Sequence, residues 1–260
     1  MDKMTLVGGI CWLINIVLAA LFAYDTRKTM TKRGILLKGL SSFGIIAYAV
    51  ALIVMWGQTS EGSCLFVIGM VLAAVGDILV ALLQETQGDE SGFLQGSLSS
   101  EFNIARFGIG VAGVLFIVGY FFEMVAFIKG LGKIASPSDY VIPFLLFFVL
   151  PPAVSVAGAL VTKIRIPNVS MNAFIIGLFY GLLATALYSS ATTYALALSR
   201  FDINHAVFIF VGATFFYTSI VFILVRYMSP KHFENVKMRY ASRLVTFLGK
   251  MTLAGCAFLF

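Results

Sequence analysis

Apolar runs long enough to cross a bilayer follow one another along almost the whole chain, separated by short polar breaks. A helix needs roughly 20 apolar residues to span the hydrocarbon core, and about eight runs approach that length. The pattern therefore predicts an all-α fold, a polytopic transmembrane helix bundle of about eight spans. The expected spans are 4–24, 34–56, 63–84, 104–128, 140–162, 171–198, 204–227 and 243–260.

Nothing in the sequence divides these spans into separate domains. The chain has no long linker, low-complexity tract, composition shift or convincing internal repeat, so we expect one transmembrane domain over residues 1–260. The fifth run contains Pro143 and the adjacent pair Pro151 and Pro152. These prolines are expected to kink or break its helix at membrane depth.

Composition and charge agree with a membrane protein. Hydrophobic residues make up 60% of the chain and charged residues 12%, which excludes an ordinary soluble domain. The formal net charge of +6 indicates orientation, because Lys and Arg concentrate in cytoplasmic loops. The sequence has no basic patch interleaved with aromatic residues, so it does not indicate nucleic acid as a partner.

The basic residues concentrate in three alternate breaks, 25–33, 163–170 and 228–242. The positive-inside rule places these breaks in the cytoplasm and both termini outside. We therefore expect a multi-pass integral membrane protein, in the plasma membrane if the source is bacterial and in an endomembrane if it is eukaryotic.

The third run contains an acidic residue in the stretch LAAVGDILVALL. A charge at this depth is costly unless it faces protein or water, which makes Asp77 a candidate functional residue. Counted from the helix ends at about 1.5 Å per residue, Asp77, Lys38 and Lys250 lie at one level. Small residues around Asp77 and serines beside Lys38 indicate that both side chains point inward. We expect Asp77 and Lys38 to form a direct or water-bridged ion pair.

Other polar residues in the spans allow more than one interpretation. Tyr180 and Ser219 lie slightly deeper than the expected ion pair, whereas Glu123, near the outer end of the fourth run, is expected to reach interfacial water. Lys250 either joins the buried charges or extends to the cytoplasmic interface. An intramembrane ion pair can also be purely structural, but a third titratable group at the same depth favours a functional site.

No pattern in the sequence indicates a metal or a cofactor. The three cysteines, Cys11, Cys64 and Cys256, lack the spacing of a zinc site. His205 and His232 lie at helix ends that are far apart in the expected topology. We therefore expect neither a metal nor a cofactor.

Three motifs carry a resemblance to a known family: LLKGLSS in the second span, GMVLAAVGDILVAL in the third and GATFFYTSIVF in the seventh. With its approximately eight spans, the chain resembles the YhhN / TMEM86 family of lysoplasmalogenases. The resemblance implies hydrolysis of the vinyl-ether bond of a lysoplasmalogen to a fatty aldehyde and a glycerophospho-base. The implied partners are a lysophospholipid substrate and membrane lipids. The family's second-span Lys falls on Lys38 and its third-span Asp on Asp77.

The chain departs from the family pattern at positions that bear on mechanism. In the seventh span Ser219 matches the first member of the family's Ser-Asp pair, but Ile220 stands at the Asp position. The fourth span's usual His and Tyr correspond to Tyr120 and Glu123, and Lys250 is nearest to a Gln that is common near the C terminus. Vinyl-ether hydrolysis suits two carboxylates, one donating a proton while the other stabilises positive charge and orients water. Half of an acid pair is therefore missing.

Asp77, held ionised beside Lys38, suits the role of base or charge stabiliser. The proton must then come from Lys250 or Tyr180, or from Glu123 if that residue lies closer than the helix ends indicate. The candidate catalytic residues are Asp77, Lys38, Ser219, Tyr180 and Lys250.

Two other classes of function remain open at the level of sequence. A catalytically silent lipid-binding or transport protein on the same scaffold is favoured by Ile220 at the acidic position. A retinal photoreceptor with Lys250 as Schiff base is disfavoured by an eighth span and by the late position of this lysine. Visible absorbance after addition of retinal would distinguish it.

Overall fold

The computed structural model describes residues 3–27, 30–56, 59–86, 104–136, 171–228 and 236–260, with isolated residues between 145 and 164. Within these ranges the chain is helical and contains no strand, which confirms the predicted all-α fold. The helices are α1 (Lys3–Asp25), α2 (Lys32–Met55), α3 (Glu61–Thr86), α5 (Ile104–Ile134), α7 (Met171–Leu198), α8 (Ile203–Met228), α10 (Val236–Ala254) and a short 3₁₀ helix, η1 (Ala257–Leu259).

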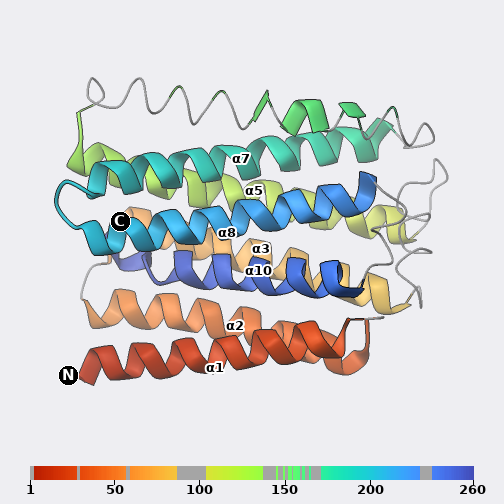
Figure 1. Cartoon of the computed structure of the whole chain (residues 1–260), viewed down its shortest axis with the longest axis horizontal. Helices are drawn as coiled ribbons and strands as arrows, with labels where there is room; N and C mark the ends of the chain where they lie inside the picture. The colour runs from red at the N-terminus through yellow and green to blue at the C-terminus, as the bar shows by residue number, and fades with distance from the viewer. Residues whose placement is uncertain are drawn as a thin grey trace.

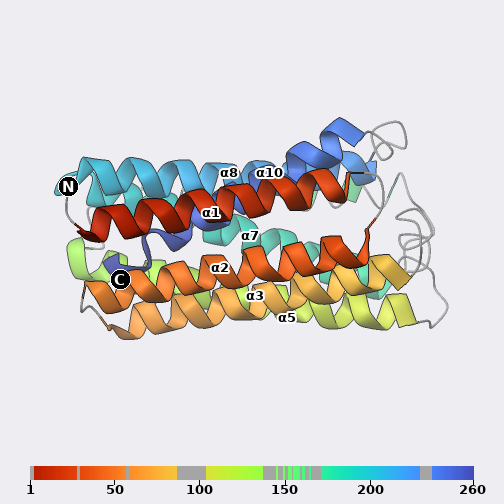
Figure 2. The ribbon, with the colours of Figure 1, turned by 90° about the horizontal axis from the view of Figure 1, so that it is seen from below.

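The helices lie side by side along the long axis of the molecule in both views (Figures 1 and 2). Each described helix packs against the next one along the chain, and α10 packs against α1, which closes the series into a ring. Helix α10 also contacts α2 across this ring. Side chains from helices far apart in the sequence therefore meet inside one bundle.

The predicted spans match these helices closely, except that α5 continues to Ile134 beyond the predicted end at 128 and that the last helix differs. Helix α7 has the predicted bounds, Met171–Leu198. Helix α10 begins at Val236 rather than at 243 and ends at Ala254, before the 3₁₀ turn. Its first turns are polar and basic, so a search for apolar runs misses them. The predicted fifth span, 140–162, and its prolines lie largely outside the described residues.

The surface of the bundle is that of a membrane protein. Four helices and the α10–η1 segment are long and apolar enough to cross a bilayer: Lys32–Met55, Glu61–Thr86, Phe107–Ile134, Ile203–Phe222 and Val236–Leu259. Large apolar side chains on the described helices face outward, among them Leu13, Phe43, Val54, Phe107 and Val207. Lipid tails solvate such side chains as well as a protein interior does. The chain is therefore a multi-pass integral membrane protein.

Charge differs between the two ends of the bundle. Helices α1 and α8 end, and α2, α5, α7 and α10 begin, at the end opposite the two chain termini (Figure 1). We call this the basic end, because the described residues Arg27, Lys32, Arg33, Arg239 and Arg243 lie in or beside these helix ends. That the basic end faces the cytoplasm stays a prediction.

Two helix pairs approach each other closely through glycine. A Cβ atom added to Gly69 of α3 would lie 2.6 Å from the carbonyl oxygen of Gly119 of α5. A Cβ atom on Gly249 of α10 would lie 2.5 Å from the backbone nitrogen of Phe216 in α8. Small residues allow this backbone approach in membrane helices. The two contacts fix the positions of α3, α5 and α10, which carry the charged side chains described next.

Candidate functional site

A buried carboxylate is held between two lysines inside the bundle. Lys38 of α2 has its Nζ 3.4 Å from Oδ1 of Asp77 in α3. Lys250 of α10 donates a hydrogen bond from Nζ to Oδ2 of the same carboxylate. The Lys38, Asp77 and Lys250 side chains are only 12%, 20% and 19% exposed. The predicted Lys38–Asp77 ion pair is confirmed, and Lys250 joins it instead of extending to the interface.

Local sequence explains why these side chains converge. Ala73 and Ala74, one turn before Asp77, are buried and keep α3 narrow beside its neighbours. Ser41, one turn after Lys38, satisfies its hydroxyl within α2 by donating to the carbonyl of Leu37. Gly249 brings α10 against α8, so the adjacent Lys250 extends across the bundle to α3.

Positive charge exceeds negative charge at this cluster. Two lysines share one carboxylate, and Lys38 Nζ also lies 5.9 Å from the centre of the Phe22 ring. The guanidinium of Arg243 lies 5.6 Å from the same ring and donates to the Thr26 carbonyl. A buried excess of positive charge is costly unless an anionic group balances it. The cluster therefore suits a ligand that carries negative charge.

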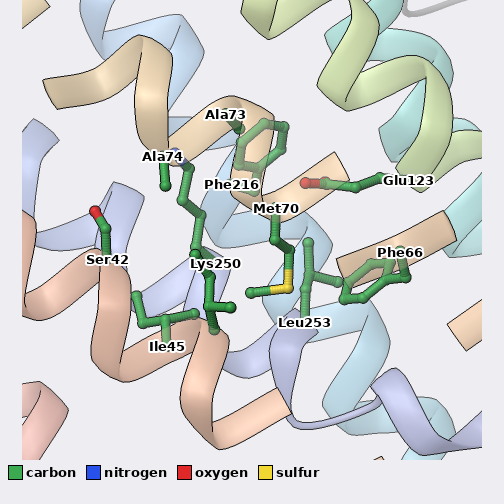
Figure 3. Close-up of a pocket in the computed structure, with 11 residues that line it drawn as sticks. Ser42, Ile45, Phe66, Met70, Ala73, Ala74, Glu123, Phe216, Lys250 and Leu253 are labelled. Atoms are coloured by element: carbon green, nitrogen blue, oxygen red, sulfur yellow. The ribbon is translucent and has the colours of Figure 1, made fainter. Parts of the chain in front are cut away.

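An apolar pocket lies beside the ion pairs and is partly open to the surface, and its empty space of about 420 Å³ includes open solvent at the mouth. On α2 and α3 the lining residues lie farther from the basic end than Lys38 and Asp77, by about one to three turns. The lining residues are Ser42, Ile45, Ile46, Phe66, Met70, Ala73, Ala74, Glu123, Phe216, Lys250 and Leu253 (Figure 3).

Glu123 occupies a different environment from the predicted one. It lines the pocket and is only 7% exposed, so the expectation that it reaches interfacial water is wrong. The error came from the helix end, because the fourth span was expected to end at 128 whereas α5 continues to Ile134. Glu123 therefore lies eleven residues from the end of α5 instead of five, which is about 16 Å along the helix.

Tyr180 and Ser219, two other predicted site residues, do not line the pocket. The Tyr180 ring packs at 5.6 Å from the ring of Tyr120, which in turn packs edge to face against the pocket residue Phe216 at 5.2 Å. Ser219 is buried and donates its hydroxyl to the carbonyl of Phe216 in its own helix. Ile220 beside it is buried in the apolar core. The structure therefore brings together Lys38, Asp77 and Lys250, whereas Ser219 contacts the pocket residue Phe216 and Tyr180 packs on Tyr120 behind that residue.

The sequence interpretation placed Ser42 on the face of Lys38 but did not predict the pocket, which Phe216 and Glu123 also line. Ser42 lies one turn from Lys38, so helical periodicity alone was sufficient to place it on the same face. Phe216 had no such signal, because its position depends on the close contact between α8 and Gly249. Among the described residues, no group of three or more His, Cys, Asp and Glu side chains is arranged to hold a metal ion.

Comparison with protein-family models, with curated proteins and with solved structures gives no match to this chain. The resemblance to the lysoplasmalogenase family therefore depends on the three sequence motifs alone and stays a prediction.

Proposed function

We propose that this chain is a membrane hydrolase that cleaves the vinyl-ether bond of lysoplasmalogens, releasing a fatty aldehyde and a glycerophospho-base. One observation carries the proposal: a carboxylate fixed between two lysines adjoins an apolar pocket inside the bundle. Such a pairing offers a fixed base and cations for an anionic head group, next to a mostly apolar lining that suits an alkenyl chain. The family resemblance supports the same reaction.

The reaction needs a proton on one alkenyl carbon and water on the other. Protonation of the carbon farther from the ether oxygen leaves an oxocarbenium ion at the neighbouring carbon. Water then adds to that ion as Asp77 orients it and takes its proton, giving a hemiacetal. The hemiacetal loses its hydroxyl proton as the ether oxygen gains one, and the carbon–oxygen bond breaks to give aldehyde and alcohol.

The phosphate of the substrate is proposed to balance the excess positive charge. Lys38 suits this contact because Lys250 already donates a hydrogen bond to Asp77, whereas Lys38 is 3.4 Å from the carboxylate. Lys38 also lies toward the basic end, and the apolar pocket lies on the opposite side of the ion pairs. A lysophospholipid with its phosphate at Lys38 would therefore direct its chain into the pocket.

Purified protein should release a fatty aldehyde from a lysoplasmalogen in detergent or nanodiscs, measured by mass spectrometry. The matched control is the lysolipid with a saturated alkyl ether, which has the same head group and chain but no double bond to protonate. We expect aldehyde from the first and none from the second. The proposal would be contradicted if the amount of intact lysoplasmalogen were the same before and after incubation with the protein.

Lys38→Met should reduce the preference of the protein for a substrate that carries a phosphate group. A hydrogen bond to a charged group contributes about 1.5–3 kcal/mol, so wild type should favour a lysoplasmalogen over its phosphate-free alkenylglycerol by roughly 10–100-fold in kcat/KM. In Lys38→Met this preference should fall towards unity, mainly through KM. A preference that survives the substitution would place the phosphate elsewhere.

A catalytically silent lipid-binding protein is the second candidate, and a specific observation favours it. Ile220, at the position of the family's second acid, is buried in the apolar core, and Ser219 donates to its own helix. A protein of this kind would retain lysolipid through purification without converting it. Intact vinyl-ether lipid that co-purifies and persists would support this function over hydrolysis.

A further inference from the structure

We infer that Glu123 is the proton donor of the site and protonates the alkenyl carbon of the substrate. The inference rests on the proposed function and supplies the acid that Ile220 does not provide. It assigns different tasks to two carboxyl groups: Glu123 of α5, which lines the pocket, and Asp77 of α3, which is bonded to the pocket residue Lys250.

The position of Glu123 supports this role. Glu123 is buried and lines the same pocket as Lys250, which is bonded to Asp77. Figure 3 shows its carboxyl end pointing toward Met70 and the interior of the pocket. Among the described residues, this carboxyl group has no hydrogen-bond or salt-bridge partner, although the charge of Lys250 in the same pocket acts on it. A buried carboxyl group that carries its proton needs no counter-ion, which fits these surroundings.

The close crossing of α3 and α5 fixes the side chain. A Cβ atom added to Gly69 would lie 2.7 Å from Cγ of Glu123 and 3.1 Å from its backbone nitrogen. The absent side chain at Gly69 therefore leaves room for the stem of Glu123 against α3. A proton donor must be held within reach of the atom it protonates, and this contact restricts where the carboxyl group lies.

The order of Asp77 and Glu123 along the bundle matches the order of the two reacting carbons in the substrate. The proton goes to the second chain carbon, and water goes to the first, which carries the ether oxygen. With the phosphate toward the basic end, the second carbon lies deeper than the first. Glu123 adjoins the part of the pocket beyond the ion pairs, and Asp77 lies nearer the basic end, so donor and base have the required order.

The proton balance closes over one turnover. Glu123 gives its proton to carbon, and Asp77 receives one from water. Proton exchange with bulk water then restores Glu123 and Asp77 to their starting forms. The overall change is one vinyl ether and one water converted to one aldehyde and one alcohol.

Glu123→Gln tests the role, because it keeps the shape of the side chain and removes the transferable proton. A positioned general acid contributes about 10²–10⁴-fold, so kcat for aldehyde release should fall by that factor while KM changes little. Glu123→Asp should recover part of the loss. Glu61→Gln, which alters an exposed acid paired with Lys129 near the other end of the bundle, should release aldehyde at the wild-type rate.

The pH profile separates a chemical role from a structural one. Wild type should lose activity on the alkaline side as the donor ionises, and Glu123→Gln should lack that decline. Equal kcat in wild type and Glu123→Gln, or no alkaline decline in the wild type, would overturn the donor role and leave the proposed function intact. No aldehyde from the wild type would overturn both.

Discussion

Asp77→Asn should destabilise the protein and greatly slow aldehyde release. The substitution leaves Lys38 and Lys250 buried with no carboxylate between them, and removal of one partner from a buried ion pair costs about 3–5 kcal/mol. It also removes the group proposed to orient and deprotonate water, a loss of about 10²–10⁴-fold in kcat. Unfolding in detergent measures the loss of stability, and aldehyde release by the folded variant measures the loss of kcat.

An exposed ion pair in the same chain is the matched control. Lys129 and Glu61 lie 2.6 Å apart, but their side chains are 40% and 76% exposed. Exposed pairs contribute about 0–1 kcal/mol, so Glu61→Gln should change stability by no more than that. If Asp77→Asn lost as little stability as Glu61→Gln, water would already screen the charges of the Asp77 cluster.

Gly249→Ala should also have a large effect, through the packing of two helices. The added Cβ would lie 2.5 Å and 2.8 Å from the backbone nitrogen and Cα of Phe216. Backbone atoms cannot rotate away as a side chain can, so α10 has to move from α8. Overpacking of this kind costs about 1–3 kcal/mol, and the shift also displaces Lys250 from Asp77.

Gly39→Ala in α2 is the control for this prediction. A Cβ atom on Gly39 would meet nothing within 4 Å, so Ala should be neutral or stabilise the helix by about 0.5–1 kcal/mol. The comparison is the midpoint of thermal unfolding of both variants in the same detergent. A Gly249→Ala protein as stable as Gly39→Ala would show that α8 and α10 are not in tight contact.

The sequence predicted the bundle and one of the two ion pairs that Asp77 makes with described residues, because both depend on local patterns. Apolar runs have the length of the helices, and depth along adjacent antiparallel helices placed Lys38 opposite Asp77. Lys250 was harder to place, since its neighbours depend on how α10 packs against α2 and α8. The last helix also begins before its apolar part, at Val236.

Glu123 illustrates what such a pattern cannot provide. Its depth was misjudged because α5 continues to Ile134, beyond the apolar run expected to end at 128. The direction of its side chain depends on the rotation of α5 about its axis, which the contact between Gly69 and Gly119 helps to set. Contacts between helices distant in sequence decide the depth of Glu123 and the direction of its side chain, so a single sequence does not determine them.

The most direct test of catalysis at Asp77 is the product formed from a lysoplasmalogen in D₂O. Protonation of an alkenyl carbon by an exchangeable group puts one deuterium on the second carbon of the aldehyde, which mass spectrometry detects. We predict this monodeuterated aldehyde from the wild type, with its release lowered by about 10²–10⁴-fold in folded Asp77→Asn. Intact lysoplasmalogen after incubation with the wild type, or equal aldehyde from both proteins, would contradict a catalytic role for Asp77.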